Sequence, residues 1–292
     1  AVAAVALMSL PKDLHLQTPP PGGRIVTMRE GPSDTVTTVV QSDGHRILRI
    51  NQRFTMGGTA SALAERRHGH LPLLLHPEPR RALFLGVGTG ISFAALEAHP
   101  GLVAEGIELV PEVAEVLPEF APHNAHSDRL TVRVADARRF VRASTQRYDV
   151  VIADLFHPAR DGAAGLYTRE HFQAIRDRLS DGGLFCQWLP LFQLDADGLR
   201  MITATFLEVF PEASALLLRL NADTPVIGLI GGQGRHLWAP EALERRLNQP
   251  ILREALKPMA LAEVLPVMGT WFADAETLKT YSQSVGINTD DH

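Results

Sequence analysis

Three glycines and a following acid are the residues of this chain whose types and spacing most clearly indicate chemistry. Gly86, Gly88, Thr89 and Gly90 form a short glycine-rich segment after an apolar run, and Glu108 follows eighteen residues after Gly90. Glycines let the backbone turn sharply and let a ligand approach it closely, and a helix start would offer unpaired N–H groups. A carboxylate ending the next strand can accept hydrogen bonds from a ribose diol. The pattern predicts a site for a nucleoside-containing ligand.

Two aspartates end later apolar runs. Asp136 precedes Ala137, so it is both a candidate contact to an adenine amino group and a candidate helix N-cap, and the two roles are compatible. Asp154 closes the run that begins at Tyr148 and precedes a loop, which makes it a candidate functional residue. Ligands of parallel sheets bind at the carboxyl ends of the strands. We therefore expect the glycine segment and these acids to meet in one crevice.

The elements that must position these residues alternate between apolar runs and amphipathic segments, which predicts a doubly wound, mostly parallel sheet. The last two runs are joined by a short polar link and predict an antiparallel terminal hairpin, which is typical of a methyltransferase-like α/β sheet. The predicted strands are 82–85, 103–107, 130–134, 148–153, 183–188, 214–219 and 225–231.

The rest of the chain divides around this sheet. Residues 1–23 hold an apolar segment and a Pro/Gly linker, 24–77 a small antiparallel β domain with a hairpin turn at 42–44, 78–235 the nucleoside-binding domain, and 236–292 a helical extension. The apolar residues 1–10 leave two interpretations open: the tail of an upstream membrane segment, or a short helix packed on the domain.

Composition limits the class of protein. With 45% hydrophobic and 21% charged residues in 292, the chain can bury a large core, and its net charge of -5 argues against a broad nucleic-acid-binding surface. The single cysteine, Cys186, excludes an internal disulfide and fits a reducing compartment. We expect a cytoplasmic protein, with membrane tethering through an upstream segment as the alternative. His68, His70 and His76 lack a matched carboxylate at helical spacing, so we expect no metal.

The chain resembles the spermidine synthase family, the polyamine aminopropyltransferases, and within it the domains that are fused to membrane segments. The resemblance spans roughly residues 29 to 231 and continues more weakly to the closing residues 288–292. The segments that carry it are 70–72 with 76–77, 86–90, 106–108, 135–137, 149–154 with Pro158, and 166–172.

The resemblance implies a reaction. An aminopropyl group passes from decarboxylated S-adenosylmethionine to an amine, and methylthioadenosine leaves. Glu108 would hold the ribose, Asp136 the adenine side, and Asp154 would orient and deprotonate the attacking amine. A small amine acceptor and a homodimer are also implied. Apart from the resemblance, His157 could be an acceptor contact, a proton shuttle or a loop histidine, and Tyr167, which follows a glycine-containing stretch, is a candidate gate over the acceptor.

This sequence departs from the family pattern on the acceptor and donor-tail side. Thr89 stands where the family usually has an aspartate that pairs with the cationic tail of the decarboxylated donor, and His157 stands where a second aspartate helps to hold the diamine. The Tyr-Gln or Tyr-His pair that lines the polyamine channel in the family falls near Ala64-Glu65 and is absent. These departures leave alternatives open: an S-adenosylmethionine-dependent methyltransferase, a methylthioadenosine-releasing lyase or cyclase, or a noncatalytic nucleoside-binding domain.

Overall fold

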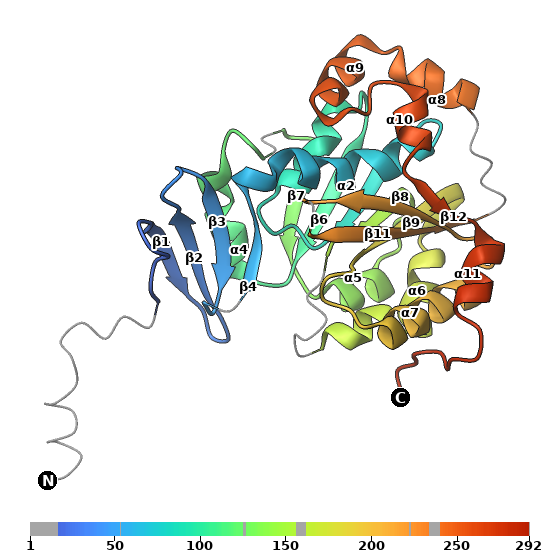
Figure 1. Cartoon of the computed structure of the whole chain (residues 1–292), viewed down its shortest axis with the longest axis horizontal. Coiled ribbons are helices and arrows are strands. Elements are labelled where there is room, and N and C mark those ends of the chain that lie inside the picture. Colours follow the sequence, from blue (N-terminus) through green and yellow to red (C-terminus); the bar gives the residue numbers. More distant parts are fainter. Residues whose placement is uncertain are drawn as a thin grey trace, which may run out of the picture.

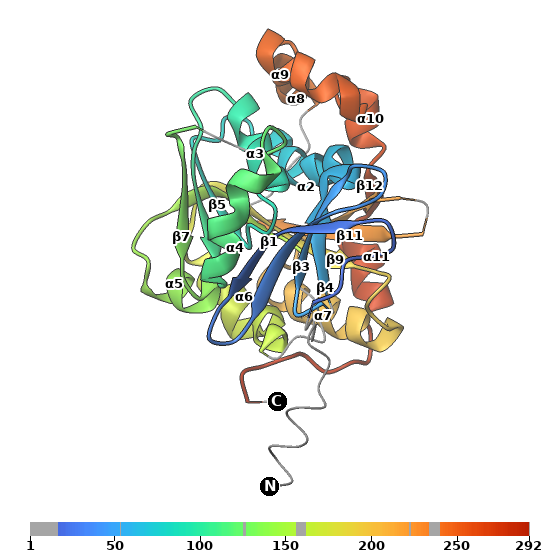
Figure 2. The same ribbon diagram turned by 90° about the vertical axis from the view of Figure 1, so that its left-hand side faces the viewer.

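The structure, a computed structural model, describes residues 17–52, 54–124, 127–155, 162–221, 223–233 and 240–291. A small sheet lies to one side of a larger sheet that has helices on both faces (Figures 1 and 2). The small sheet is antiparallel, in the order β1-β2-β3-β4. Its strands are β1 (Arg24–Glu30), β2 (Thr35–Val40), β3 (Arg46–Ile50) and β4 (Phe54–Gly58).

The hairpin that the sequence predicts in the small sheet is confirmed. The N–H of Gln41 donates to the carbonyl of His45 at 2.8 Å, and Gly44 adopts a φ of 86° that few other residues tolerate. Val36 and Val39 of β2 are buried, and β-branched side chains of this kind suit a pleated strand. The turn therefore sets the register of β2 on β3.

The large sheet has the order β12-β10-β11-β9-β8-β5-β6-β7. Strands β5 to β9 are parallel, whereas β11 joins β9 antiparallel and β10 forms a hairpin with β11. This confirms a methyltransferase-like sheet with an antiparallel terminal hairpin. The strands are β5 (Arg81–Leu85), β6 (Val103–Glu108), β7 (Leu130–Val134), β8 (Tyr148–Ala153), β9 (Leu179–Pro190), β10 (Ser214–Arg219), β11 (Pro225–Gly232) and β12 (Trp271–Ala273).

Helices cover the two faces of the large sheet. One face carries α2 (Ala62–Leu75), α3 (Ile91–Ala94), η2 (Ala95–Ala98), α8 (Pro240–Leu247), α9 (Pro250–Leu256), η5 (Lys257–Met259) and α10 (Val264–Met268). The other face carries η4 (Ala163–Tyr167), α5 (Ala137–Ala143), α6 (Arg169–Arg176), α7 (Ala196–Val209) and α11 (Ala275–Tyr281). The remaining helical turns are η1 (Thr59–Ser61), α4 (Pro111–Val116) and η3 (Leu117–Phe120).

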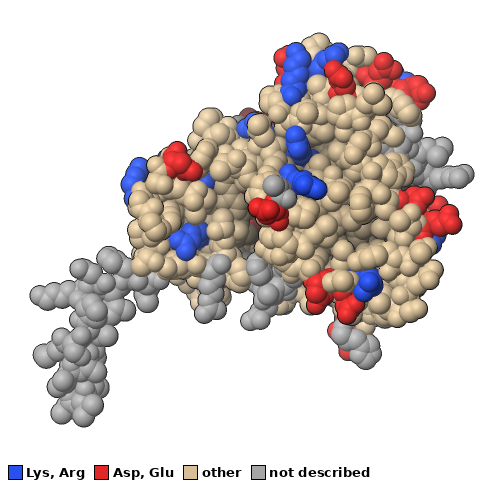
Figure 3. Space-filling view, viewed as in Figure 1, with Lys and Arg blue, Asp and Glu red and all other residues tan. Residues whose placement is uncertain are grey.

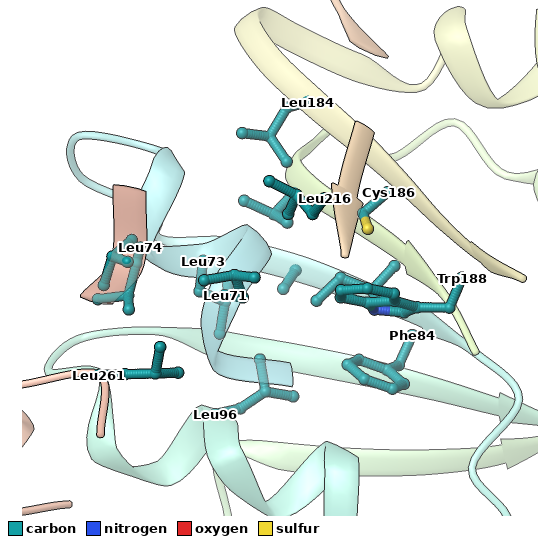
Figure 4. Packing of buried hydrophobic residues seen from close by; sticks show 14 of the residues in the cluster. Leu71, Leu73, Leu74, Phe84, Leu96, Leu184, Cys186, Trp188, Leu216 and Leu261 are labelled. Carbon is teal, nitrogen blue, oxygen red and sulfur yellow. The ribbon is translucent and has the colours of Figure 1, made fainter. Parts of the chain in front are cut away.

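The helix α2 belongs with the large sheet, although the predicted boundary at residue 77 groups it with the small one. Its Leu71, Leu73 and Leu74 are buried against Phe84 and Trp188 of the large sheet (Figure 4). A side chain at Gly69 would place a Cβ 2.2 Å from the carbonyl oxygen of Ser92, so only glycine allows this close approach of α2 to α3. The position of α2 matters because its first turns face the predicted site.

The helix α4 joins the two sheets. Val113 and Val116 of α4 and Phe120 of η3 are buried against Leu48 and Ile50 of the small sheet. Beside them, Arg46 of β3 donates to the Glu119 carboxylate at 2.7 Å. This packing fixes the small sheet beside the end of β6, where the chain leaves Glu108.

The C-terminal extension is mostly helical, as expected, but it also contributes the edge strand β12, which the sequence did not predict. Three residues are too few for a readable period-2 pattern, and the strand forms only because β10 offers an unpaired edge. The charged side chains on the face in Figure 3 are scattered in both signs, without a broad basic area among the described residues. No helix in the described part of the chain has the length and apolarity needed to cross a bilayer; residues 1–16 lie outside that part.

A buried arginine fastens α8 to the rest of the fold. Arg246 donates to the carbonyls of Leu73 and His76, and to Nδ1 of His99 at 2.7 Å. Since a guanidinium can only donate, His99 accepts at Nδ1 and its Nε2–H donates to Nδ1 of His70, 3.0 Å away. Burial lowers the pKa of His70 to about 3, so this chain of rings is neutral. His70 is thus a packing residue in this network.

We expect Arg246→Met to lower the free energy of unfolding by about 2–4 kcal/mol, because it leaves two carbonyls and a ring nitrogen unpaired in the interior. Urea denaturation followed by circular dichroism measures this loss. The matched control is Arg245→Met on the exposed side of the same helix, which should change stability by less than about 0.5 kcal/mol. Equal stability of the two variants would contradict the anchoring role of Arg246.

Candidate active site

The glycine segment links β5 to α3 in a conformation that only glycine adopts readily. Gly86, Gly88 and Gly90 have φ values of 86°, 54° and 76°. The N–H of Gly86 donates to the carbonyl of Ile107 at 2.9 Å, and that of Gly90 to Val87 at 2.9 Å, so the turn is tied to β6 and closed on itself. The helix α3 that follows ends at Ala94 and continues as the 3-10 turn η2.

Glu108, at the end of β6, holds this turn in place. Its Oε2 accepts from the N–H groups of Val87 at 3.2 Å and Gly88 at 3.1 Å, and its Oε1 accepts from Val110 at 3.0 Å. An ionised carboxylate offers about four acceptor positions. Backbone N–H groups occupy three of these acceptor positions, which leaves about one position for a ligand hydroxyl. The same bonds occupy amides that a phosphate would need, so the turn is unsuited to cradle one.

One cavity of about 320 Å³ collects the predicted residues. Its volume lies near the lower end of the range for small-molecule sites, about 300–1,000 Å³. The predicted residues that line it are Gly86, Gly88, Thr89, Glu108, Asp136, Ala137 and Asp154. Gly90 does not line the cavity; it caps α3, packed against Leu117 and Asn124.

Asp136 combines the two roles that the sequence left compatible. It is the N-cap of α5, where its Oδ1 accepts from the N–H of Arg139 at 2.8 Å. Its side chain is exposed toward the cavity that it lines, so the second carboxylate oxygen is not needed for the cap. The geometry fits a residue that both starts a helix and contacts a ligand.

Asp154 lies where β8 ends, next to the glycine segment. Its N–H donates to the carbonyl of Leu85 at 3.0 Å, which places it level with the end of β5. Burial raises the pKa of its carboxyl to about 7, assisted by the charges of Glu65 and Glu108 and opposed by the N–H of Leu155, which donates to Oδ1 at 2.8 Å. A carboxyl poised near neutral pH is suited to accept a proton.

Of the two residues predicted for the acceptor side, the structure describes Tyr167, and it does not line the cavity. His157 lies outside the described residues. Tyr167 is 3% exposed and packs in the core beneath η4, whereas its neighbours Ala163 and Leu166 line the cavity. Burial raises the pKa of the Tyr167 hydroxyl. A contact of either residue with an acceptor stays a prediction.

Several cavity-lining residues were missed by sequence reasoning. Glu65 and His68 of α2 lie at one end, Phe54 and Met56 of β4 form a wall, and Gln193 follows β9. These residues carry no motif, and their convergence depends on how α2 and the small sheet pack beside the glycine segment. Glu65 stands near the place of the absent Tyr-Gln or Tyr-His pair of the family, and an acid at that place was itself a signal.

The C-terminal tail folds back beside the cavity. Arg138, which lines the cavity next to Ala137, is ion-paired with Asp290, and Arg142 donates to the same carboxylate at 2.8 Å. Asn288 connects the tail to the start of α6: the backbone N–H of Arg169 donates to the carbonyl of Asn288 at 2.9 Å. The ion pairs hold the pKa of Asp290 well below its usual range.

Comparisons with known proteins identify the family of this chain. The model of the spermine/spermidine synthase domain matches residues 64–220, just over half of the chain, so the chain belongs to that family. The spermidine synthase of Dictyostelium discoideum is 27% identical over 146 residues, which cover 49% of this chain and 51% of that protein. Putrescine N-methyltransferase 2 of Nicotiana attenuata is 29% identical over 190 residues, 63% of this chain and 51% of that protein.

The solved structure of the spermidine synthase from Thermotoga maritima shares the fold, with a TM-score of 0.72 at 18% identity over 89% of this chain and 87% of that one. The chain spans about half the length of the curated relatives it matches. Family membership confirms the resemblance read from the sequence, while these comparisons lend no support to the further prediction of a membrane-fused subgroup.

The raised pKa of Asp154 predicts how stability changes with pH. Between its ordinary value and about 7, the folded protein binds more protons at this site than the unfolded chain, so the site destabilises the fold increasingly as pH rises through this window. Asp154→Asn removes the charge and can keep the bond from Leu155. We expect the variant to gain at least about 1 kcal/mol over the unaltered protein between pH 5 and pH 8, after allowance for solvent at the cavity.

Thermal unfolding of both proteins at the two pH values measures this gain. Asp181→Asn, at an exposed position near the start of β9, is the control for removing a surface charge and should show no such pH-dependent gain. A gain for Asp154→Asn that is the same at pH 5 and pH 8 would mean that Asp154 titrates like a solvated carboxyl.

Proposed function

We propose that this protein transfers the three-carbon chain of an adenosyl sulfonium donor, S-adenosylmethionine or its decarboxylated form, to a small amine, with release of methylthioadenosine. The observation that carries the proposal is Asp154, a carboxyl with a pKa of about 7 in a cavity shared with Glu108 and Asp136. Membership of the spermine/spermidine synthase domain family supports the same reaction.

The nucleoside half of the donor fits the acids at the strand ends. Glu108 keeps about one acceptor position for a ribose hydroxyl, and Asp136 presents a free oxygen for an adenine amino group. The walls between them are apolar, with Ile107 and Leu155 among the lining side chains. A flat base with polar edges suits such a slot.

The proposed reaction assigns Asp154 a defined task. An ammonium has no lone pair, so Asp154 takes one proton from the acceptor as it binds. The amine nitrogen then attacks the chain carbon bonded to sulfur; a C–N bond forms, the C–S bond breaks, and its electron pair neutralises the sulfonium. Because the leaving sulfur is already cationic, no acid is needed to assist its departure. Holding the amine and the donor together in the cavity supplies most of the remaining rate acceleration.

A second candidate is methyl transfer from S-adenosylmethionine to an amine. It is favoured by the similarity to the putrescine N-methyltransferase of Nicotiana attenuata and by the uncharged Thr89 at the loop. The two reactions differ in which carbon bound to sulfur is attacked. Aminopropyl-type transfer leaves methylthioadenosine, whereas methyl transfer leaves S-adenosylhomocysteine.

The first experiment incubates the protein with each of the two donors, with and without putrescine, and identifies the nucleoside product by mass spectrometry. We expect methylthioadenosine that depends on the amine. Amine-dependent S-adenosylhomocysteine would establish the second candidate instead. Methylthioadenosine formed at the same rate without amine would indicate a lyase or cyclase, and tight nucleoside binding without any product would contradict both transfers.

The role of Asp154 as base predicts a pH profile. Transfer requires the unprotonated carboxylate, so kcat/KM should rise with pH and level off above about 7. Asp154→Asn should lower kcat by about 10²–10⁴-fold while methylthioadenosine binding, measured by calorimetry, stays within a few-fold. If kcat/KM of the Asp154→Asn variant still rises through pH 7, the titration belongs to a group other than Asp154.

A further inference from the structure

The end of the cavity next to Thr89 contains a second buried acid, Glu65, from the first turn of α2. The hydroxyl of Thr89 donates to its Oε2 at 3.0 Å. The N–H of Gly58 and the hydroxyl of Ser61 donate to its Oε1 at 3.0 and 2.5 Å. Every one of these donors is neutral. Glu65 therefore places a carboxylate against the glycine segment, where the segment itself has only a hydroxyl.

This carboxylate has no counter-charge within the described part of the chain. Glu65 is 9% exposed and lines the cavity, and no Lys, Arg or His of the described residues forms an ion pair with it. Burial raises the pKa of Glu65, and its neutral hydrogen-bond donors only partly offset this effect. A buried carboxylate without a cation is unfavourable. A ligand that brings a positive charge to this place would relieve that cost.

One turn further along α2, His68 offers a second acceptor. Its ring stacks on Trp188 with centroids 4.7 Å apart, and burial lowers the pKa of His68 to about 3, so the ring is neutral. Its Nε2 is buried and has no hydrogen-bond partner among the described residues, although His68 lines the same cavity. A neutral imidazole can accept one hydrogen bond from an ammonium, which has three to donate.

A carboxylate on the ligand would be poorly accommodated at this end. Among the described residues that line the cavity, Arg138 is the one permanent cation, and it lies beside Ala137 and is already paired with Asp290. The charged groups near Thr89 are the carboxylates of Glu65 and Asp154, and the charge of Glu65 raises the pKa of Asp154. Like charges that share a site in this way repel.

We propose that Glu65, with His68, binds the ammonium at the end of the donor's three-carbon chain and so selects a decarboxylated adenosyl sulfonium over S-adenosylmethionine. The assignment rests on the proposed function, because it takes the adenosyl group to lie between Glu108 and Asp136. From there the chain on sulfur extends along the glycine segment toward Thr89. Glu65 is in this sense a specificity-determining residue for the donor.

The test compares three ligands by calorimetry: methylthioadenosine, which lacks the three-carbon chain, decarboxylated S-adenosylmethionine, and S-adenosylmethionine. We expect the unaltered protein to bind the decarboxylated donor at least about 10-fold more tightly than S-adenosylmethionine. Glu65→Gln should weaken the decarboxylated donor by about 10–100-fold, which corresponds to about 1.4–2.8 kcal/mol, and leave methylthioadenosine within about 3-fold.

Glutamine suits the test because its amide oxygen can still accept from Gly58 and Ser61, while the hydroxyl of Thr89 can turn to accept from the amide nitrogen. Glu244→Gln, on the exposed side of α8, is the matched control and should change none of the three affinities. The double variant Glu65→Gln with Thr89→Asp moves the acid across the 3.0 Å contact onto the glycine segment and should restore most of the preference.

If the unaltered protein binds methylthioadenosine but has equal affinity for the two donors, the assignment of Glu65 is overturned while the proposed function stands. A Glu65→Gln variant that loses methylthioadenosine as strongly as the donor would show that Glu65 only braces the glycine segment. If the unaltered protein binds no methylthioadenosine, the proposed function itself fails, and the assignment of Glu65 fails with it.

Discussion

The carboxylate of Glu108 is the interaction on which the arrangement of the site depends. It accepts from three backbone amides, two in the glycine segment after β5 and one just after β6. Buried amides without acceptors are costly, and a turn built from left-handed glycines has no regular secondary structure to satisfy them. One acid thus fixes the ends of two neighbouring strands and shapes the floor of the cavity from which Asp154 is reached.

The cavity itself is closed by parts of the chain that are distant in sequence. The helix α4 packs Val113 and Val116 against the small sheet, and that contact carries β4 to the edge of the cavity. Next to the end of β4, α2 reaches the glycine segment because Gly69 permits a close approach to α3. The small sheet is therefore a wall of the site, and not only an appendage of the larger sheet.

Acidic side chains dominate the charge of this cavity. Glu65 and Glu108 both raise the pKa of Asp154, and burial, which contributes most, acts in the same direction. A site of this kind suits cationic ligands, and it contains in Asp154 a carboxyl whose pKa lies near neutral pH. In the proposed reaction, these acids would offset the positive charges of the sulfonium and of the amine.

The sequence by itself determined the strands of a mostly parallel sheet and, at their carboxyl ends, Glu108, Asp136 and Asp154. Strands of one parallel sheet end at one edge, so residues that follow them must lie close together. Glu65 and His68 could not be predicted in this way, because a helix side chain approaches the glycine segment only through the packing of α2 across the sheet. Likewise, the burial of Tyr167 beneath η4 was decided by tertiary packing, which alone determines which face of a short turn meets the core.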